Sequence, residues 1–173
     1  RNPHAQSMLA SSPLRSARGR ARLQQTHATH QPMLLEVAGG VRLHGIASLP
    51  AAQPPRAMVL LLHGWEGSAE SSYMRLTAAQ LLHAGLAVFR LNFRDHGNSH
   101  HLNEGVFHSN RIDEVVAAAG TVAKLWPDVP LLAAGYSLGG NFALRLALRA
   151  PAAGLSLQRV AAVCPLLDPA GAM

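Results

Sequence analysis

The sequence predicts an α/β fold: a three-layer sandwich in which helices cover both faces of a mostly parallel sheet. Short apolar runs alternate with helix-like segments along the chain, as they do in proteins built from strand–helix–strand units. The run at 57–62 is apolar at every position, which is typical of a strand buried on both faces of a parallel sheet. At 173 residues, the chain is long enough for one domain with its own core.

Each expected element follows from a local pattern. Two β-like runs flank Gly39 and Gly40, which can adopt positive φ angles in a tight hairpin turn; these runs lie at 33–37 and 41–48. Apolar runs predict further strands, the last of them also of the buried type, at 57–62, 86–93, 131–136 and 159–164. Helical spacing, with Gly85 and Pro127 as stop signals, predicts helices at 71–83, 112–126 and 139–150.

The first 32 residues differ from the rest in composition. They are rich in Arg, Ser and His and show no clear periodicity. We therefore expect a poorly packed, basic N-terminal arm at 1–32 and a folded region at 33–173. The same Arg-rich, Ser-rich and acid-poor composition is also typical of a transit peptide.

Charge and composition exclude several classes of protein. Apolar residues make up 49% of the chain and charged residues 14%, which is a globular rather than a disordered composition. The net charge is +6, but residues 1–35 hold five Arg and no acidic residue, so the remainder is nearly neutral. This balance predicts no nucleic-acid partner. No apolar run approaches the ~20 residues that a membrane helix needs, so we expect no integral membrane segment.

The cysteine content bears on the compartment. Cys164 is the single cysteine, so an intrachain disulfide is impossible. It lies in the apolar run 160–164, which suits a buried thiol and is compatible with a reducing compartment. Because no stretch resembles a signal peptide either, we expect a cytoplasmic protein.

The stretch at 135–139 reads Gly-Tyr-Ser-Leu-Gly and lies between an expected strand and an expected helix. Gly-x-Ser-x-Gly in this setting is the pattern of a nucleophile elbow, where a serine sits on a sharp turn from strand to helix. Gly135 and Gly139 supply the room that such a turn needs, and the first amides of the helix point toward a developing oxyanion. A Gly-rich turn of another α/β fold would show the same five residues.

A second signal follows the strand expected at 57–62. Ligands bind at the carboxyl ends of strands in open α/β sheets, and this strand ends at 63–68, His-Gly-Trp-Glu-Gly-Ser. An acyl-transfer site needs two backbone N–H donors, one from the residue after the nucleophile and one from a loop that often carries His-Gly. We expect these donors to be the amides of Leu138 and Trp65, supported by His63, Gly64, Gly135 and Gly139. The alternative is a strand-to-helix loop without a ligand.

Four stretches together resemble the α/β-hydrolases, and specifically their YheT-like branch. They are 60–68 (Leu-Leu-Leu-His-Gly-Trp-Glu-Gly-Ser), 93–99 (Phe-Arg-Asp-His-Gly-Asn-Ser), 135–141 (Gly-Tyr-Ser-Leu-Gly-Gly-Asn) and 164–169 (Cys-Pro-Leu-Leu-Asp-Pro). Residues 1–7 resemble that branch's N-terminal Asn-x-His-x-Gln-Thr pattern, with Ser7 in place of Thr. The resemblance implies that 33–173 is the N-terminal part of an α/β-hydrolase domain, truncated before its last strands. It also favours a retained N-terminal arm over a cleaved transit peptide.

The resemblance implies a carboxylester hydrolase that works through an acyl-enzyme, with Ser137 as nucleophile, a small apolar ester as substrate and no cofactor. The family's charge-relay Asp and its His come after later strands, in the order Ser, Asp, His. No position of this chain matches either, so we expect the chain by itself to be catalytically incomplete. The alternative is a non-catalytic, truncated hydrolase fold that binds apolar ligands or a partner.

Two further residues are weighed as members of a triad. Asp168 follows a strand and comes after Ser137, so it is a conceivable acid, although a turn residue before Pro169 is the simpler interpretation. His63 belongs to the expected oxyanion loop, where a histidine more often braces the loop than acts as a base.

The loop after the strand at 86–93 is rich in histidine, with His96, His100, His101 and His108. Spacing of i, i+4 binds metal on a helix, and Gly97 argues against a helix here. We therefore expect no metal site. Arg94 and Asp95 are expected to anchor the turn that follows their strand, not to contact substrate.

Overall fold

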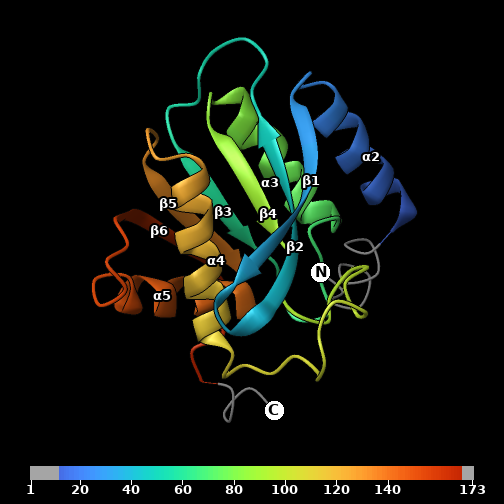
Figure 1. Ribbon diagram of the computed structural model, residues 1–173. Helices are drawn as coiled ribbons and strands as arrows, with labels where there is room; N and C mark the ends of the chain where they lie inside the picture. The colour runs from blue at the N-terminus through green and yellow to red at the C-terminus, as the bar shows by residue number, and fades with distance from the viewer. Residues whose placement is uncertain (1–11, 169–173) are drawn as a thin grey trace.

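The computed structural model describes residues 12–168, which form an α/β sandwich around one six-stranded sheet (Figure 1). The strands are β1 (Thr29–Val37), β2 (Val41–Leu49), β3 (Met58–Leu62), β4 (Ala87–Leu91), β5 (Leu131–Tyr136) and β6 (Leu157–Val163). The helices are α2 (Pro13–Gln24), α3 (Ser72–His83), α4 (Ile112–Leu125) and α5 (Leu138–Arg149), with a 3₁₀ turn η1 (Ala38–Gly40) between β1 and β2. The N-terminal pattern at 1–7, and Pro169 at the end of the last matching stretch, lie outside the described residues.

The strand order is β1-β2-β4-β3-β5-β6. β1 pairs with β2, and β2 with β4, in antiparallel fashion. The pairs β3–β4, β3–β5 and β5–β6 are parallel, which confirms the prediction of a mostly parallel sheet. The carboxyl ends of β3, β4 and β5 therefore meet at one edge, where ligands bind in sheets of this kind.

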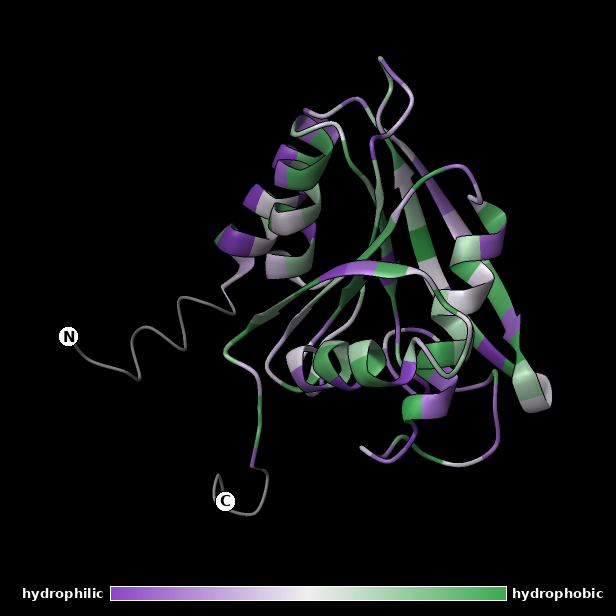
Figure 2. Cartoon of the chain, turned by 90° about the vertical axis from the view of Figure 1, so that its left-hand side faces the viewer, coloured by the Kyte–Doolittle hydropathy of each residue, from purple (hydrophilic) through white to green (hydrophobic). Residues whose placement is uncertain are grey.

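Alternate side chains of β3 show the three layers. Leu60 and Leu62 pack into a core shared with α4 and α5, whereas Leu61 packs into a second core shared with α2 and α3. All three leucines are fully buried. Figure 2 shows the helices on the two sides of the sheet. The run at 57–62 is apolar throughout because both faces of this central strand are covered.

The hairpin of β1 and β2 has the expected turn, since Gly39 and Gly40 have φ angles of 76° and 72°. Its register pairs Val37 with Val41 and extends to Thr29 and Leu49. β1 thus begins four residues before the predicted run at 33–37. The extra residues pair with β2 although their side chains are exposed, so hydrophobic alternation gave no sign of them.

The structure corrects the prediction of a poorly packed arm, because residues 13–24 form α2 and pack on α3. Ser12 caps the helix by accepting a hydrogen bond from the Arg15 amide at 3.3 Å, and Pro13 occupies the first turn. A Cβ on Gly19 would lie 3.2 Å from the Ser72 carbonyl oxygen, so the two helices pack closely at this glycine. α2 buries only Gly19 and Leu23, and this narrow apolar stripe explains why no helical period is visible in the sequence.

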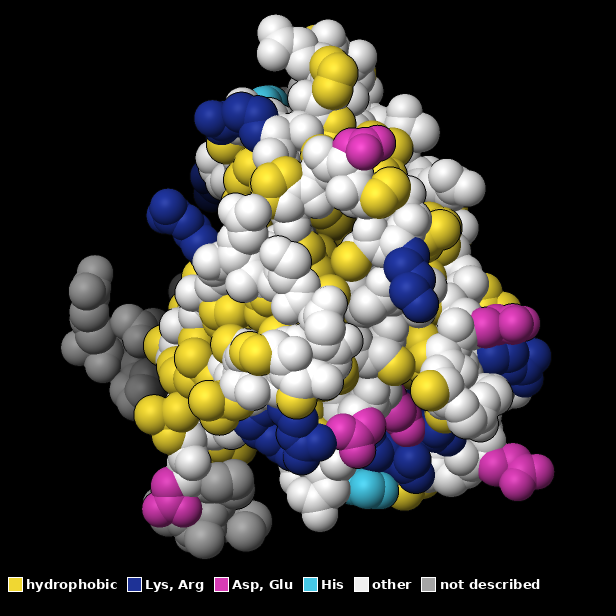
Figure 3. Space-filling view, turned by 60° about the vertical axis from the view of Figure 1, so that its left-hand side comes forward, with side chains coloured by type: hydrophobic (Ala, Val, Ile, Leu, Met, Phe, Trp, Pro, Cys, Tyr) yellow, Lys and Arg dark blue, Asp and Glu magenta, His cyan; other side chains and the backbone are white. Residues whose placement is uncertain are grey.

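The structure also corrects the prediction of a buried strand at 159–164. Among the described strands, β6 lies at the edge of the sheet, and its residues are exposed or half-buried. Cys164 is exposed, contrary to the expected buried thiol. Hydrophobic side chains gather on the face that carries α5 and β6 (Figure 3), with Leu148 81% and Leu167 70% exposed. An apolar run predicts a strand but does not distinguish a central strand from an edge strand.

The remaining elements begin and end within two residues of the predicted bounds. In the pairing of β3 with β5, Leu62 lies opposite Gly135. The segments that leave these two strands, 63–68 and 136–138, therefore start side by side at the carboxyl edge of the sheet.

Candidate active site

Ser137 sits on the sharp turn between β5 and α5 and is exposed. Its backbone has φ 51° and ψ −116°, an unfavourable conformation for a residue with a Cβ. The Ser137 amide donates to the Val163 carbonyl at 2.9 Å, and the Ser137 carbonyl accepts from the Asn141 amide at 3.0 Å. These bonds hold the strained residue between β6 and the first turn of α5. A nucleophile elbow requires a conformation of this kind.

The glycines on either side leave no space for side chains. A Cβ on Gly135 would overlap the backbone of Gly139 and lie 2.7 Å from the Gly140 nitrogen. A Cβ on Gly139 would overlap the His63 carbonyl and lie 2.5 Å from the Leu62 carbonyl oxygen. The start of α5 thus packs directly against the ends of β3 and β5, and this close approach fixes where Ser137 stands.

The loop at 63–68 runs beside the serine. A Cβ on Gly64 would lie 3.5 Å from the Ser137 Cβ and 3.4 Å from the Tyr136 carbonyl oxygen. Among the described residues, neither the Trp65 amide nor the Leu138 amide donates to a protein acceptor. The two amides predicted as oxyanion donors are therefore both available to a ligand, on segments that flank Ser137.

His63 is fully buried, and both its ring nitrogens are engaged. Nε2 accepts a hydrogen bond from the Phe93 amide at 3.2 Å, so Nδ1 carries the proton and donates to the Gly64 carbonyl at 2.7 Å. Burial lowers the pKa of His63 to about 4, so the ring is neutral. Its ring packs on Phe93 and His96, with centroids 4.5 and 4.9 Å away. His63 ties the ends of β3 and β4 together and has no nitrogen free to act as a base.

Tyr73 supports the same loop and was not found by sequence reasoning. Its hydroxyl accepts a hydrogen bond from the Gly64 amide at 2.9 Å. Its ring packs edge-on against Tyr136, with centroids 5.0 Å apart, and the Tyr136 hydroxyl lies 2.5 Å from the Thr77 hydroxyl. α3 thus braces both the loop and the end of β5. In the sequence, Tyr73 appears only as an apolar position of a helix.

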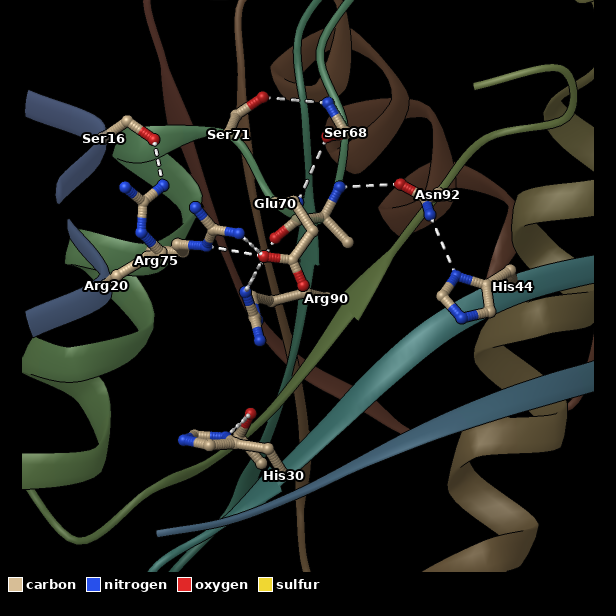
Figure 4. A network of polar contacts seen from close by, with 12 residues as sticks. Ser16, Arg20, His30, His44, Ser68, Glu70, Ser71, Arg75, Arg90 and Asn92 are labelled. Carbon is tan, nitrogen blue, oxygen red and sulfur yellow. Dashed lines mark hydrogen bonds and ion pairs between the residues drawn. The ribbon is translucent and has the colours of Figure 1, made fainter. Parts of the chain in front are cut away.

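Asn92, which follows β4, holds the far end of the loop. Its side-chain oxygen accepts from the Ala69 amide at 2.7 Å, and its side-chain nitrogen lies 3.0 Å from Nδ1 of His44 on β2 (Figure 4). Asn92 is buried, so these bonds satisfy polar groups that water does not reach. No spacing signal in the sequence distinguishes this asparagine.

The turn after β4 is anchored as expected by Arg94. Its guanidinium makes an ion pair with Glu114 on α4, in which Nε and Nη2 donate to Oε1 at 3.0 and 2.8 Å and Nε also donates to Oε2 at 3.2 Å; Nη1 donates to the Glu104 carbonyl. Arg111 donates to the same Glu114 oxygen at 3.0 Å. Both Arg94 and Glu114 are largely buried, so the pair fixes this turn against α4.

Asp95 has a φ of 61° and accepts a hydrogen bond from His100 Nδ1 at 2.6 Å. The hydrogen bond from His100 lowers the pKa of the Asp95 carboxyl. Within residues 12–168, no three His, Cys, Asp or Glu side chains come together as metal ligands. The described helices also include none that is long and apolar enough to cross a bilayer.

A cavity of about 360 Å³ opens beside the loop, lined by Trp65, Glu66, Gly67, Asp95, His96, Gly97, His100 and Phe107. The Trp65 side chain is 64% exposed, and its ring meets Phe107 edge-on at 6.1 Å. A larger cavity, of about 870 Å³, involves Pro130 and Leu131 at the amino end of β5, away from Ser137. Of these two cavities, only the smaller one is lined by residues of the loop that runs beside Ser137.

The six-stranded sheet, the turn at Ser137 and the adjacent loop together define a member of the α/β-hydrolase superfamily. The family model described as "Serine aminopeptidase, S33" matches residues 53–173, and the chain belongs to this family. No curated protein matches the sequence. Membership of the YheT-like branch stays a prediction.

Solved structures show the same fold. The Pyrococcus furiosus esterase Pf2001 is similar at a TM-score of 0.70 and 20% identity, over 82% of this chain and 53% of that one. Esterase Est22 is similar at a TM-score of 0.69 and 20% identity, over 97% of this chain and 56% of that one. XC6422 from Xanthomonas campestris, described as an α/β serine hydrolase without a lid, is similar at a TM-score of 0.63 and 24% identity, over 76% of this chain and 60% of that one. The chain thus spans about half the length of the first two.

Proposed function

We propose that this chain is the nucleophile-bearing part of a serine hydrolase that cleaves carboxylic esters through an acyl-enzyme, with Ser137 as the nucleophile. The observation that carries the proposal is the strained, exposed Ser137, with φ 51°, placed beside the Gly64 backbone. Such strain is retained where function needs it, since a relaxed turn would not project the serine from the sheet edge.

The reaction begins when Ser137 Oγ attacks the ester carbonyl and forms a tetrahedral oxyanion. The Trp65 and Leu138 amides donate hydrogen bonds to that oxyanion, and the N-terminus of α5 adds its positive end. When this intermediate collapses, the base returns the proton to the leaving oxygen, the alcohol departs and an acyl group remains on Ser137. Water then attacks the acyl group, which releases the carboxylic acid and restores the Ser137 hydroxyl.

The base that takes the Ser137 proton is not supplied by His63, because both its nitrogens are engaged. Among the described residues, no histidine is hydrogen-bonded to Ser137 Oγ. We therefore place the triad His and its Asp partner C-terminal to the residues described, as the family resemblance implies.

The substrate we propose is a small ester with an apolar part that contacts Trp65 and Phe107. The exposed Trp65 ring, which meets the half-buried Phe107 edge-on, favours an apolar group, since contact with it removes apolar surface from water. The esterase activity named for Pf2001 and Est22 supports an ester rather than a peptide, although the family is described as an aminopeptidase family.

The test is hydrolysis of p-nitrophenyl butyrate by the protein expressed from its complete gene, by the 173-residue chain, and by Ser137→Ala and Ser109→Ala variants. We expect turnover by the complete protein and by Ser109→Ala, which changes an exposed loop serine, and none by Ser137→Ala. The 173-residue chain should show no enzymatic turnover.

Two outcomes would contradict this account. Activity of the 173-residue chain within tenfold of the complete protein, lost in Ser137→Ala, would show that a histidine of this chain is the base. Absence of turnover in every protein, on esters of several chain lengths, would favour the non-catalytic alternative.

A further inference from the structure

Another cavity, of about 250 Å³, lies on the face of the sheet that α2 and α3 cover. Residues from five segments of the chain line it: Arg20, Leu23 and Gln24; His30 and Pro32; Ile46; Glu70 and Arg75; and Arg90. α2, α3, β1, β2 and β4 therefore all contribute to one small space. Ser137 does not line it, so this cavity is separate from the candidate active site.

The lining carries an excess of positive charge. Three arginines, Arg20, Arg75 and Arg90, face one carboxylate, Glu70. Three positive charges less one negative charge leaves an excess of two. Burial and then the charge of Arg90 lower the pKa of His30, which favours its neutral form.

Arg90 is the unusual member of this set, because it is only 2% exposed and lacks a matched anion. Its Nη1 donates to the Ala69 carbonyl at 2.8 Å and lies 3.9 Å from Glu70 Oε2. Its Nε is buried with no hydrogen-bond partner, and its Nη2 makes no hydrogen bond to any described residue. In Figure 4, the terminal nitrogen that is not joined to Glu70 points toward His30. A buried guanidinium without its acceptors is costly, so an acceptor in the cavity would stabilise it.

Glu70 does not neutralise Arg90, because its carboxylate is already paired with Arg75. The Arg75 Nε donates to Glu70 Oε2 at 2.5 Å, and a second Arg75 nitrogen contacts the same oxygen. The Glu70 side chain is 48% exposed, whereas that of Arg90 is 2% exposed. Arg20 donates to Ser16 at 2.9 Å through one nitrogen and keeps its other donors available.

We propose that this cavity binds a small tetrahedral dianion with the size and charge of phosphate, held by Arg20, Arg75 and Arg90. Guanidinium groups present forked donors that match the oxygens of a phosphate, and a charge of −2 balances the excess of the lining. The dianion would bridge α2, α3 and β4, and would therefore hold the N-terminal helix on the sheet. Free phosphate and the phosphate group of a small monoester present the same oxygens, so both sources are tested.

The experiment titrates inorganic phosphate into the complete protein by isothermal calorimetry, with thermal unfolding measured in parallel. Sodium chloride at equal ionic strength is the control for screening. We expect saturable binding and a rise in melting temperature with phosphate and not with chloride. Glycerol phosphate in a second arm distinguishes the sources: tighter binding identifies a monoester, and equal or weaker binding identifies free phosphate.

Matched variants assign the binding to this cavity. Arg20→Gln and Arg18→Gln each remove one charge from α2, but only Arg20 lines the cavity. Both side chains are exposed, so both variants should fold. We expect phosphate binding about tenfold weaker in Arg20→Gln, because a charge-assisted hydrogen bond is lost, and unchanged binding in Arg18→Gln.

A third variant tests the role of the carboxylate. Glu70→Gln should bind phosphate more tightly, because it removes the competing negative charge from the lining. Equal binding by Arg20→Gln and Arg18→Gln, or no saturable binding by the wild type, would overturn the proposal.

Discussion

Gly139 lies against Leu62 so closely that a Cβ on Gly139 would be 2.5 Å from the Leu62 carbonyl oxygen. This contact joins the first turn of α5 to the end of β3. It therefore couples the turn that carries Ser137 to the loop that carries Gly64 and Trp65. This backbone approach is therefore one of the contacts that set the distance between the proposed nucleophile and its proposed oxyanion donor.

Gly139→Ala should push β3 and α5 apart, and we expect a loss of stability of about 1–3 kcal/mol, with loss of ester hydrolysis. Gly120→Ala is the matched control, because Gly120 lies inside α4 and a Cβ added there would meet no atom within 4 Å. That change should stabilise the protein by about 0.5–1 kcal/mol. Urea unfolding measures both. Equal effects of the two changes would mean that the approach of Gly139 to Leu62 is not tight.

Tyr73→Phe removes the acceptor of the Gly64 amide, and we expect a loss of about 1 kcal/mol together with slower ester hydrolysis. Tyr136→Phe removes a hydroxyl that bonds Thr77 and not the loop. We therefore expect a similar stability loss from Tyr136→Phe but little change in kcat. If kcat responds equally to the two changes, Tyr73 has no particular role in placing the loop.

Protonation of His63 should make stability depend on pH. Its pKa is lowered by burial from 6.5 to about 4, so between these values the unfolded state binds a proton that the folded state does not. The stability contributed by neutral His63 is present above pH 6.5 and is lost as the pH falls toward 4, by roughly 3 kcal/mol in total.

The measurement is urea unfolding at about pH 7 and about pH 4.5, on either side of most of this titration, for wild type, His63→Asn and His83→Asn. His83 is exposed on α3 and serves as the control. We expect His63→Asn to lose less stability over this range than the other two proteins. Parallel losses in all three would assign the pH dependence to other groups.

Glu114→Gln should destabilise the turn after β4, because it leaves the largely buried Arg94 without its carboxylate. Removing one partner of a buried pair costs about 3–5 kcal/mol, and partial exposure of Glu114 places this case at the lower end. Asp113→Asn is the control, since Asp113 is 81% exposed in its pair with Arg149 and should change stability by less than about 1 kcal/mol. Thermal unfolding compares the two variants directly, and equal shifts in melting temperature would show that the Arg94–Glu114 pair does not hold the turn.

The sequence predicted the parts of the fold that rest on strong local patterns. The apolar run that became β3 and the Gly39–Gly40 hairpin follow from chain periodicity and backbone freedom, and both are present. α2 was missed, because a helix that buries only Gly19 and Leu23 leaves no apolar period to read. The exposure of β6 was missed, because an apolar composition does not state how many neighbours a strand has.

The residues of the candidate site likewise include some that the sequence predicted and some that it did not. Ser137 and Gly64 were located from motifs, since strained turns and close approaches restrict which residues fit. Tyr73 and Asn92 were not, because their roles depend on contacts with residues far along the chain. The buried Arg90, whose Nε has no hydrogen-bond partner, could not be predicted either, since the sequence does not say which arginine lies inside the protein.

Covalent labelling tests most directly whether Ser137 is the nucleophile. The complete protein is treated with a fluorophosphonate probe, digested and sequenced by mass spectrometry, beside its Ser137→Ala and Ser109→Ala variants. The proposal predicts one adduct, on Ser137, that forms in wild type and Ser109→Ala and is absent in Ser137→Ala. Equal labelling of Ser137→Ala, or an adduct on another serine of the wild type, would contradict it.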